Sequence, residues 1–344
     1  MEFQDSFITT AIGSFPHLDE REVLPLILRD FPYIPFWPQL PRSSFLEGMV
    51  AQFSEGFPSL KLDKKEQRLW VDTSSGFDED VERFYQAVEK DDIEFFRISE
   101  KYARGLRLLN DLAREEVRKK IKYIKAQVTG PITFGLSLSD QEKRPIFYDP
   151  TLREILIHHL SFKARWLEKR LHDLFPGIPT MIFFDEPALS AFGSAFSGLN
   201  QEDVTLSLNQ CYSAVEGLKG THCCGNTDWS LLLSTELDIL SFDAYGYLEN
   251  LSLYPKELTN FLERGGILAW GIVPTSEDVQ KEDAQGLVNR FQKGVEALSK
   301  EGIDPALLKR AILTPSCGTA SLSIPLAERV CYLTAEVSKR LRGS

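Results

Sequence analysis

The sequence predicts an α/β fold, a (β/α)8 TIM barrel, because eight short apolar runs alternate with longer amphipathic stretches along its 344 residues. Several runs are almost continuously hydrophobic, which is typical of parallel strands covered on both faces. The alternative, an open doubly wound sheet, is disfavoured because no Gly-x-Gly-x-x-Gly follows the first run. The predicted strands are residues 7–14, 34–40, 123–128, 180–184, 220–224, 239–243, 266–272 and 311–314. The predicted helices include residues 152–174, 202–218, 283–301 and 324–342.

The connection between the second and third runs, residues 41–122, is far longer than such connections usually are. It contains a segment, 60–73, that could form a hairpin, followed by charged helices through 89–120. We interpret residues 41–122 as an insertion after the second strand that forms part of the substrate wall or a lid. No linker or low-complexity tract interrupts the chain, so residues 1–344 are predicted to form one catalytic domain.

The composition narrows the possible partners. With a formal charge of −11 and no basic stripe, the chain is not expected to bind nucleic acid or an anionic membrane surface.

No apolar run reaches the ~18 residues that cross a bilayer, and the start lacks signal-peptide features, so a cytoplasmic location is expected. The five cysteines are too few and too scattered for a disulfide framework, which makes them free thiols or metal ligands.

Three residues of the kind that bind metals lie near the carboxyl ends of predicted strands. His222 and Cys224 belong to the fifth run, and Cys317 follows the eighth. Because side chains alternate along a strand, His222 and Cys224 point the same way and Cys223 points opposite. One imidazole and two thiolates suit zinc, and three protein ligands leave a position for a substrate thiol. Alternatively, the cysteines are small buried hydrophobic residues. Asp243, after the sixth run, is either a fourth ligand or a helix cap.

Other polar residues at strand ends could bind a substrate. Asp185 and Glu186 follow the fourth run, and one of these carboxylates could hold a substrate ammonium group or take part in proton transfer. Because side chains alternate, only one should face the cavity while the other makes a structural bond. It is also possible that both bond loop backbone. Gly13 and Ser14, after the first run, could bind a carboxylate or form an ordinary turn.

The aromatic and histidine side chains near the strand ends could belong either to the site or to ordinary structure. Phe36, Trp37 and Trp270 could line the site, although such residues are at least as often part of the core. His17 could shuttle protons, although a lone loop histidine is more often solvated.

Four segments, in the same order, resemble the catalytic half of cobalamin-independent methionine synthase. They are Ile12-Gly13-Ser14-Phe15-Pro16, Asp185-Glu186-Pro187-Ala188-Leu189, His222-x-Cys224 and Ser316-Cys317-Gly318. The run His222-Cys223-Cys224-Gly225-Asn226 also resembles uroporphyrinogen decarboxylase-like methyltransferases that act with corrinoid partners. No single motif is specific, but their combination is, and it spans most of the chain.

The resemblance implies a zinc-dependent enzyme, on a (β/α)8 barrel, that transfers a methyl group to the thiol of homocysteine to give methionine. By this resemblance His222, Cys224 and Cys317 would be zinc ligands. Asp243 would stand where the family usually has a glutamate ligand.

The resemblance also implies a substrate pocket. Gly13 and Ser14 would bind the carboxylate of homocysteine, Asp185 would bind its ammonium group, and Met49 would line the same pocket. The acidic pocket residue that the family has before this methionine lacks a clear counterpart, for which Glu47 is a substitute.

Two further departures from the family concern the methyl donor. The synthase has a second, N-terminal barrel that helps to bind folate, and a catalytic histidine that residues 271–276 do not offer. Methylcobalamin, free or on a corrinoid protein, is therefore the preferred donor, and methyl-tetrahydrofolate is the alternative. Two other classes stay open: a uroporphyrinogen decarboxylase-like lyase, which would need converging arginines, and a noncatalytic barrel stabilised by zinc.

Overall fold

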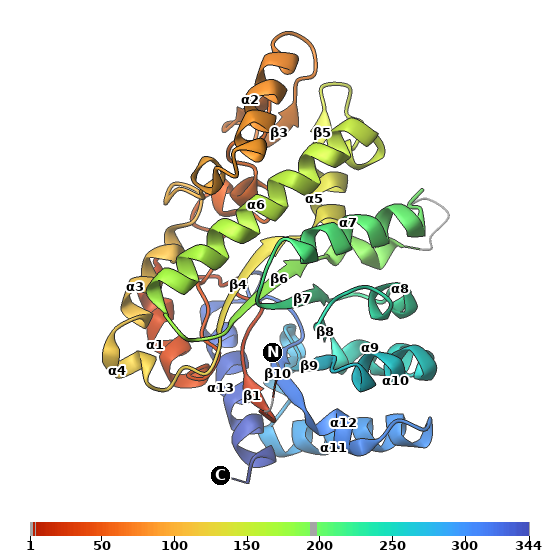
Figure 1. Ribbon diagram of the computed structural model, residues 1–344. Helices are drawn as coiled ribbons and strands as arrows, with labels where there is room; N and C mark the ends of the chain where they lie inside the picture. The colour runs from red at the N-terminus through yellow and green to blue at the C-terminus, as the bar shows by residue number, and fades with distance from the viewer. Residues whose placement is uncertain (1–2, 4, 193–197, 344) are drawn as a thin grey trace.

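The structure, a computed structural model, describes residue 3, residues 5–192 and residues 198–343. Its centre is a curled sheet of seven parallel strands in the order β1-β10-β9-β8-β7-β6-β4 (Figure 1). Helices connect the strands, which confirms an α/β fold with a parallel sheet. The strands are β1 (Ile8–Thr9), β4 (Ile124–Thr129), β6 (Thr180–Asp185), β7 (Leu218–Cys223), β8 (Ile239–Phe242), β9 (Ile267–Val273) and β10 (Ala311–Pro315).

The second predicted strand, residues 34–40, lies between the two edges of this sheet but does not join it as a regular strand. Gln39 donates a backbone hydrogen bond of 2.8 Å to Gly13, and Lys125 in β4 donates one of 3.0 Å to Pro35. The prolines of this segment have no N–H to donate, which limits regular pairing. The curled sheet and this linking segment are consistent with a TIM-like barrel.

Two hydrophobic cores lie on the two faces of the sheet. The larger one combines strand side chains with the apolar faces of the helices. The smaller one contains side chains from the strands and from segments beside them, and none from the helices, so it fills the inside of the curl. Burial on both faces explains why the strand runs are so continuously hydrophobic. The inner core is made by Phe3, Ile8, Ile34, Tyr123, Met181, Phe183, Leu218, Ile239, Ile267, Ala269 and Ile312.

Helices cover the outer face of the sheet (Figure 1). The predicted helix over 202–218 is too long, because α7 (Gln201–Ser213) has to end before Leu218 pairs with Met181 in the sheet. Three other predicted helices are confirmed as α6 (Pro150–Leu174), α11 (Ala284–Lys300) and α13 (Ile324–Leu341). The remaining helices around the sheet are α1 (Glu20–Asp30), α5 (Pro131–Ser137), α8 (Trp229–Leu233), α9 (Ala244–Leu251), α10 (Pro255–Glu263) and α12 (Pro305–Lys309).

Residues 41–122 form a small sheet and several short helices. The predicted hairpin is confirmed: β2 (Leu60–Asp63) pairs antiparallel with β3 (Arg68–Val71), and β5 (Ser139–Asp140) extends this sheet. After α2 (Phe77–Glu89), the predicted charged helices are reduced to 3-10 turns, α3 (Leu108–Leu112) and α4 (Glu115–Arg118). The buried side chains Phe96, Ile98 and Ala103 do not share one helical face, so a continuous helix could not bury them together. In Figure 1, α2 and β3 lie beyond α6, away from the strands of the large sheet.

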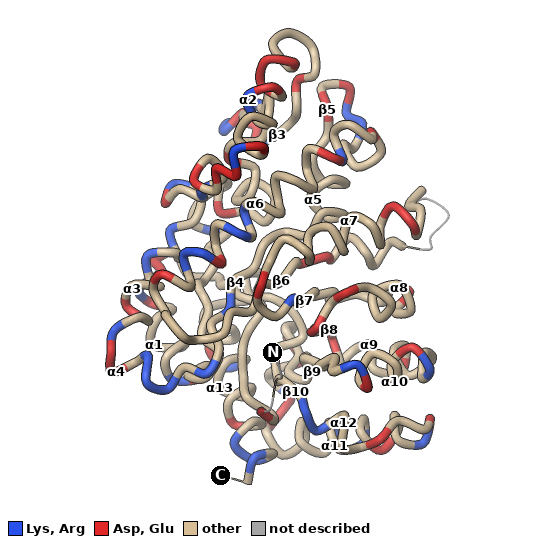
Figure 2. The backbone as a smooth tube through the Cα atoms, in the orientation of Figure 1, with Lys and Arg blue, Asp and Glu red and all other residues tan. Residues whose placement is uncertain are grey.

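Charged residues follow the outer helices, with both signs interspersed, whereas the strands of the large sheet are mostly uncharged (Figure 2). None of the helices in the described part of the chain is long and apolar enough to cross a membrane.

Candidate metal centre

His222, Cys224 and Cys317 come together at the carboxyl ends of β7 and β10. Their ligand atoms all lie within 4.8 Å of one another, in a group that could hold a metal ion. Zinc bond lengths place the ligand atoms of a tetrahedral site roughly 3.5–3.8 Å apart. Small side-chain movements would therefore bring these three atoms to bonding distance of one ion.

The imidazole of His222 is oriented by the neighbouring strand. Its Nδ1 is hydrogen-bonded to the hydroxyl of Ser241 at 2.9 Å, and the two residues are paired in register between β7 and β8. Its Nε2 is buried and has no hydrogen-bond partner among the described residues. An unpaired polar atom in a protein interior is costly, and a metal ion would satisfy it.

The two sulfur atoms of the group interact with each other. A hydrogen bond from Cys317 lowers the pKa of Cys224, with a further contribution from His222, and the same bond raises the pKa of Cys317. One thiolate is therefore favoured in this pair. Cys223 is buried in the outer core, as alternation requires, and it donates to the Gly225 carbonyl at 3.6 Å. An imidazole nitrogen without a partner and a favoured thiolate form a donor set that fits zinc.

Asp185 ends β6 beside this group. It is paired in register with His222, so the two side chains point to the same face of the sheet. Burial raises the pKa of the Asp185 carboxyl to about 6, although the nearby Lys125 and His222 oppose this shift. Its Oδ1 is buried and has no hydrogen-bond partner in the described part of the chain. Asp185 can therefore accept a hydrogen bond from a ligand.

Glu186 points away from Asp185 and binds the backbone amides in the first turn of α5. Its carboxylate accepts hydrogen bonds from the amides of Ile132 (2.9 Å) and Thr133 (2.7 Å), and from the Thr133 hydroxyl (2.7 Å). Burial nevertheless raises the pKa of Glu186 to about 7. The structure thus separates the two adjacent carboxylates: one faces the metal group and the other bonds the backbone of a helix.

The Gly13–Ser14 turn lies against the loop that carries Cys317. The carbonyl of Ser14 accepts hydrogen bonds from the amide and the hydroxyl of Thr319, both at 2.9 Å. A Cβ on Gly318 would lie 2.0 Å from the Ser14 hydroxyl oxygen, so this hydroxyl is in contact with the Cys317 loop. Gly13 has a φ of +126°, a conformation that strongly favours glycine.

Asp243 follows β8, whereas Met49 lies in the segment after residue 40 and contacts the end of β4. Asp243 caps α9 by accepting a hydrogen bond of 2.8 Å from the amide of Gly246, which is the capping role considered from the sequence. Burial raises the pKa of Asp243, and it is not one of the residues whose ligand atoms lie within 4.8 Å of one another. The Met49 carbonyl accepts a hydrogen bond of 2.6 Å from Thr129, at the end of β4.

The other residues singled out from the sequence are buried. Phe36, Trp37 and Trp270 belong to the outer core, where the ring of Trp270 lies 4.8 Å from that of Phe291 in α11. They therefore do not form a floor for the site. His17 is 2% exposed, and burial lowers its pKa, so the expectation of a solvated loop histidine is wrong.

Sequence reasoning missed three residues of the site. Ser241 orients His222, and Lys125 is a buried cation on the strand next to Asp185. Thr314 lies two residues after Ile312 of the inner core and so points to the same face of β10, and its buried hydroxyl has no partner among the described residues. Lys125 left a signal, because a lysine in the middle of an apolar run needs a compensating environment. For Ser241 and Thr314, only the pairing of the strands shows which groups these side chains face.

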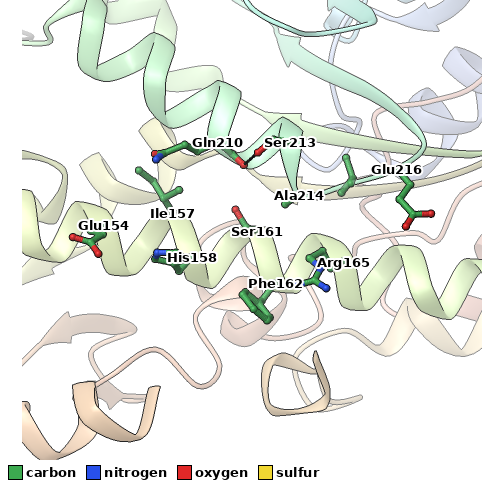
Figure 3. A pocket seen from close by; sticks show the side chains of 11 residues that line it. Glu154, Ile157, His158, Ser161, Phe162, Arg165, Gln210, Ser213, Ala214 and Glu216 are labelled. Carbon is green, nitrogen blue, oxygen red and sulfur yellow. Dashed lines mark hydrogen bonds between the residues drawn. The ribbon is translucent and has the colours of Figure 1, made fainter. Parts of the chain in front are cut away.

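A separate groove of about 530 Å³ lies on the outer surface between α6 and α7 (Figure 3). Its lining includes Glu154, Arg165 and Glu216, and none of the residues of the metal group. It is therefore not a continuation of the metal centre.

Neither the protein-family models nor the curated proteins include a match to this chain. Among solved structures, the chain is similar to a methyltransferase from Methanosarcina mazei, with 14% identity and a TM-score of 0.54 over 97% of this chain and 94% of that one. A B12-independent methionine synthase from Shewanella sp. W3-18-1, in complex with selenomethionine, has 18% identity and a TM-score of 0.48 over 69% and 67%. A putative vitamin-B12 independent methionine synthase from Listeria monocytogenes has 16% identity and a TM-score of 0.45 over 69% and 68%. The likeness to the Methanosarcina protein shows a shared fold over nearly the whole chain.

Proposed function

We propose that this protein is a zinc-dependent methyltransferase that moves a methyl group to the thiol of homocysteine, giving methionine. The observation that carries this proposal is the group of His222, Cys224 and Cys317, with ligand atoms within 4.8 Å of one another at the ends of parallel strands. The unpaired Oδ1 of Asp185 beside the group supports an acceptor that has an ammonium group. The fold shared with a methyltransferase supports the same class of reaction.

His222, Cys224 and Cys317 would hold the zinc ion, with Asp243 as a fourth ligand that the substrate can displace. When bound, zinc would lower the pKa of a coordinated substrate thiol and so supply a thiolate nucleophile at neutral pH. With the imidazole proton on Nδ1, His222 donates its hydrogen bond to the Ser241 hydroxyl, and this supports the arrangement because it leaves the Nε2 lone pair free for the metal.

The other site residues would orient the acceptor. Asp185 would accept hydrogen bonds from the ammonium group, and the Gly13 amide and Ser14 hydroxyl would bind the carboxylate. Met49 would line the same pocket. Held in this way, the substrate sulfur attacks the methyl carbon in line, and the new S–C bond forms as the bond between the methyl group and its donor breaks.

The donor that we favour is methylcobalamin, free or on a corrinoid protein, and methyl-tetrahydrofolate comes second. We further propose that the chain is one closed (β/α)8 barrel and that residues 41–122 are an insertion after its second strand that acts as a lid. The hydrogen bond between Met49 and Thr129 supports the lid, because it holds part of this segment at the carboxyl end of β4.

The test is methionine formation by the zinc-loaded protein, with homocysteine as acceptor and each donor offered separately. Turnover with methylcobalamin alone, lost in Cys317→Ser together with bound zinc, is the expected result. Turnover with methyl-tetrahydrofolate alone would overturn the donor assignment and keep the acceptor chemistry.

Two outcomes would overturn the proposed function. If zinc stays bound, its sulfur coordination is unchanged by added homocysteine and no methionine forms, the noncatalytic zinc barrel becomes the better explanation. If the purified protein holds no zinc and releases carbon dioxide from a polycarboxylate, the lyase explanation replaces the methyltransferase.

A further inference from the structure

A lysine is enclosed on the inner side of the curled sheet. Lys125 in β4 is 1% exposed, and its ammonium group donates to the carbonyl of Ile12 (3.0 Å) and the side-chain oxygen of Gln127 (3.3 Å). The ring of Phe183, in the inner core, lies 4.8 Å from the Lys125 nitrogen. Burial lowers the pKa of Lys125 to about 8. Both of these hydrogen-bond acceptors are uncharged, so enclosing this cation costs free energy that a structural role alone does not explain.

The hydrogen bonds of Lys125 connect it to the Gly13–Ser14 turn. Ile12, whose carbonyl it bonds, immediately precedes this turn. Gln127, its second partner, fills the space beside Gly13, where a Cβ would lie 2.2 Å from the Gln127 amide nitrogen. The same nitrogen donates to the Trp37 carbonyl at 3.2 Å. Lys125 and Gln127 therefore fix the turn against β4 from inside the sheet.

Lys125 forms no ion pair with a described residue, but its charge and that of Asp185 influence each other. The two residues lie on adjacent strands, and the charge of each acts on the other. Lys125 lies behind the Gly13–Ser14 turn, whereas Asp185 lies beside His222. The interior thus has a positive side and a negative side, which is the arrangement that orients a zwitterion.

We propose that Lys125 is a positioning residue that holds the Gly13–Ser14 turn and, as a fixed positive charge behind it, selects thiol substrates that bear a carboxylate. This inference rests on the proposed function and assigns to Lys125 the preference of the site for thiols that bear a carboxylate, a class that includes homocysteine. Simple aminothiols, which have no group for the positive side of the site, are excluded from tight binding.

The test is calorimetric binding of three thiols to the zinc-loaded protein. They are homocysteine, homocysteine without its amino group (a mercaptobutanoate) and homocysteine without its carboxylate (an aminopropanethiol). Lys125→Gln removes the charge and keeps a hydrogen-bond donor, whereas Lys125→Met removes both. An unpaired unit charge several ångströms away in a partly dry site changes affinity roughly 10- to 100-fold. Both variants should weaken the two carboxylate thiols by such a factor and leave the aminopropanethiol unchanged.

The matched control is Lys163→Met. Lys163 is also fully buried, on α6, where it donates to the carbonyl of Phe96 at 3.2 Å. This variant should bind all three thiols as the wild type does. An equal loss for all three thiols in the Lys125 variants would make Lys125 merely structural and overturn the inference.

The wild-type measurements separate this inference from the proposed function. If the wild type binds the three thiols equally well, the carboxylate is not recognised and only the inference about Lys125 fails. If it binds none of them, the proposed function fails and the inference fails with it. Should neither neutral variant fold, Lys125→Arg has to keep the wild-type preference for the mercaptobutanoate, and its loss would overturn the inference.

Discussion

Removing the charge should affect fold stability at Glu186 and thiol binding at Asp185, although the two carboxylates are adjacent in the sequence. Glu186 accepts three hydrogen bonds, from the amide of Ile132 and from the amide and hydroxyl of Thr133. Asp185 has a buried oxygen without a partner and faces the metal group. We therefore expect Glu186→Gln to destabilise the fold and Asp185→Asn to impair thiol binding while the fold stays stable.

The magnitude for Glu186 follows from its three donors. The oxygen of a glutamine side chain can take the place of one carboxylate oxygen, but its NH2 group then faces at least one of the buried donors. Each buried donor without a partner costs about 1–3 kcal/mol, so Glu186→Gln should lower the free energy of unfolding by this amount. Glu186→Ala leaves all three donors without a partner, and at this cost for each donor it should lower the free energy of unfolding by roughly 3–9 kcal/mol. Asp185→Asn removes a buried charge and should change stability by less than about 1 kcal/mol.

The measurement is chemical unfolding at pH 8, above the raised pKa of Glu186. Hydrogen exchange at the amides of Ile132 and Thr133 adds a local readout, because Glu186→Gln should speed it. Thiol affinity of Asp185→Asn is measured by calorimetry under the same conditions. Glu66→Gln, in the exposed hairpin turn, is the control and should stay within about 0.5 kcal/mol of the wild type. The reasoning is refuted if Glu186→Gln keeps wild-type stability and amide protection but loses thiol binding.

Three further predictions follow from the same contacts. Ser241→Ala should weaken zinc binding about 10- to 100-fold in a chelator competition, because the imidazole loses its orienting hydrogen bond. Gly13→Ala should destabilise the protein by roughly 1–3 kcal/mol more than Gly265→Ala, measured by unfolding. Both glycines have positive φ, but a Cβ has open space only at Gly265, since at Gly13 it meets Gln127. Burial lowers the pKa of Lys163 to about 7 from 10.5, so the unfolded chain binds more protons between these values. The contribution of Lys163 to the free energy of unfolding should therefore rise as pH increases from about 7 to 10.5, so the wild type should gain stability relative to Lys163→Met over this range.

Most strand positions could be predicted because parallel strands buried on both faces leave a nearly continuous hydrophobic run. The second strand is the exception, since residues 34–40 are equally apolar but contain prolines that cannot pair regularly. Helix ends were less predictable. The apolar pattern of α7 runs on into β7 at Leu218, and only the pairing of that strand shows where the helix has to stop.

The sequence by itself determined that His222, Cys224 and Cys317 would lie at one edge of a sheet, because alternation and parallel strands depend only on local geometry. Tertiary structure decided what the two buried carboxylates of the site do. It directs Asp185 toward the metal group and Glu186 toward the first turn of α5. The physical reason is that an electrostatic or hydrogen-bonding role depends on the partners a side chain meets across strands, and those partners are distant in the sequence.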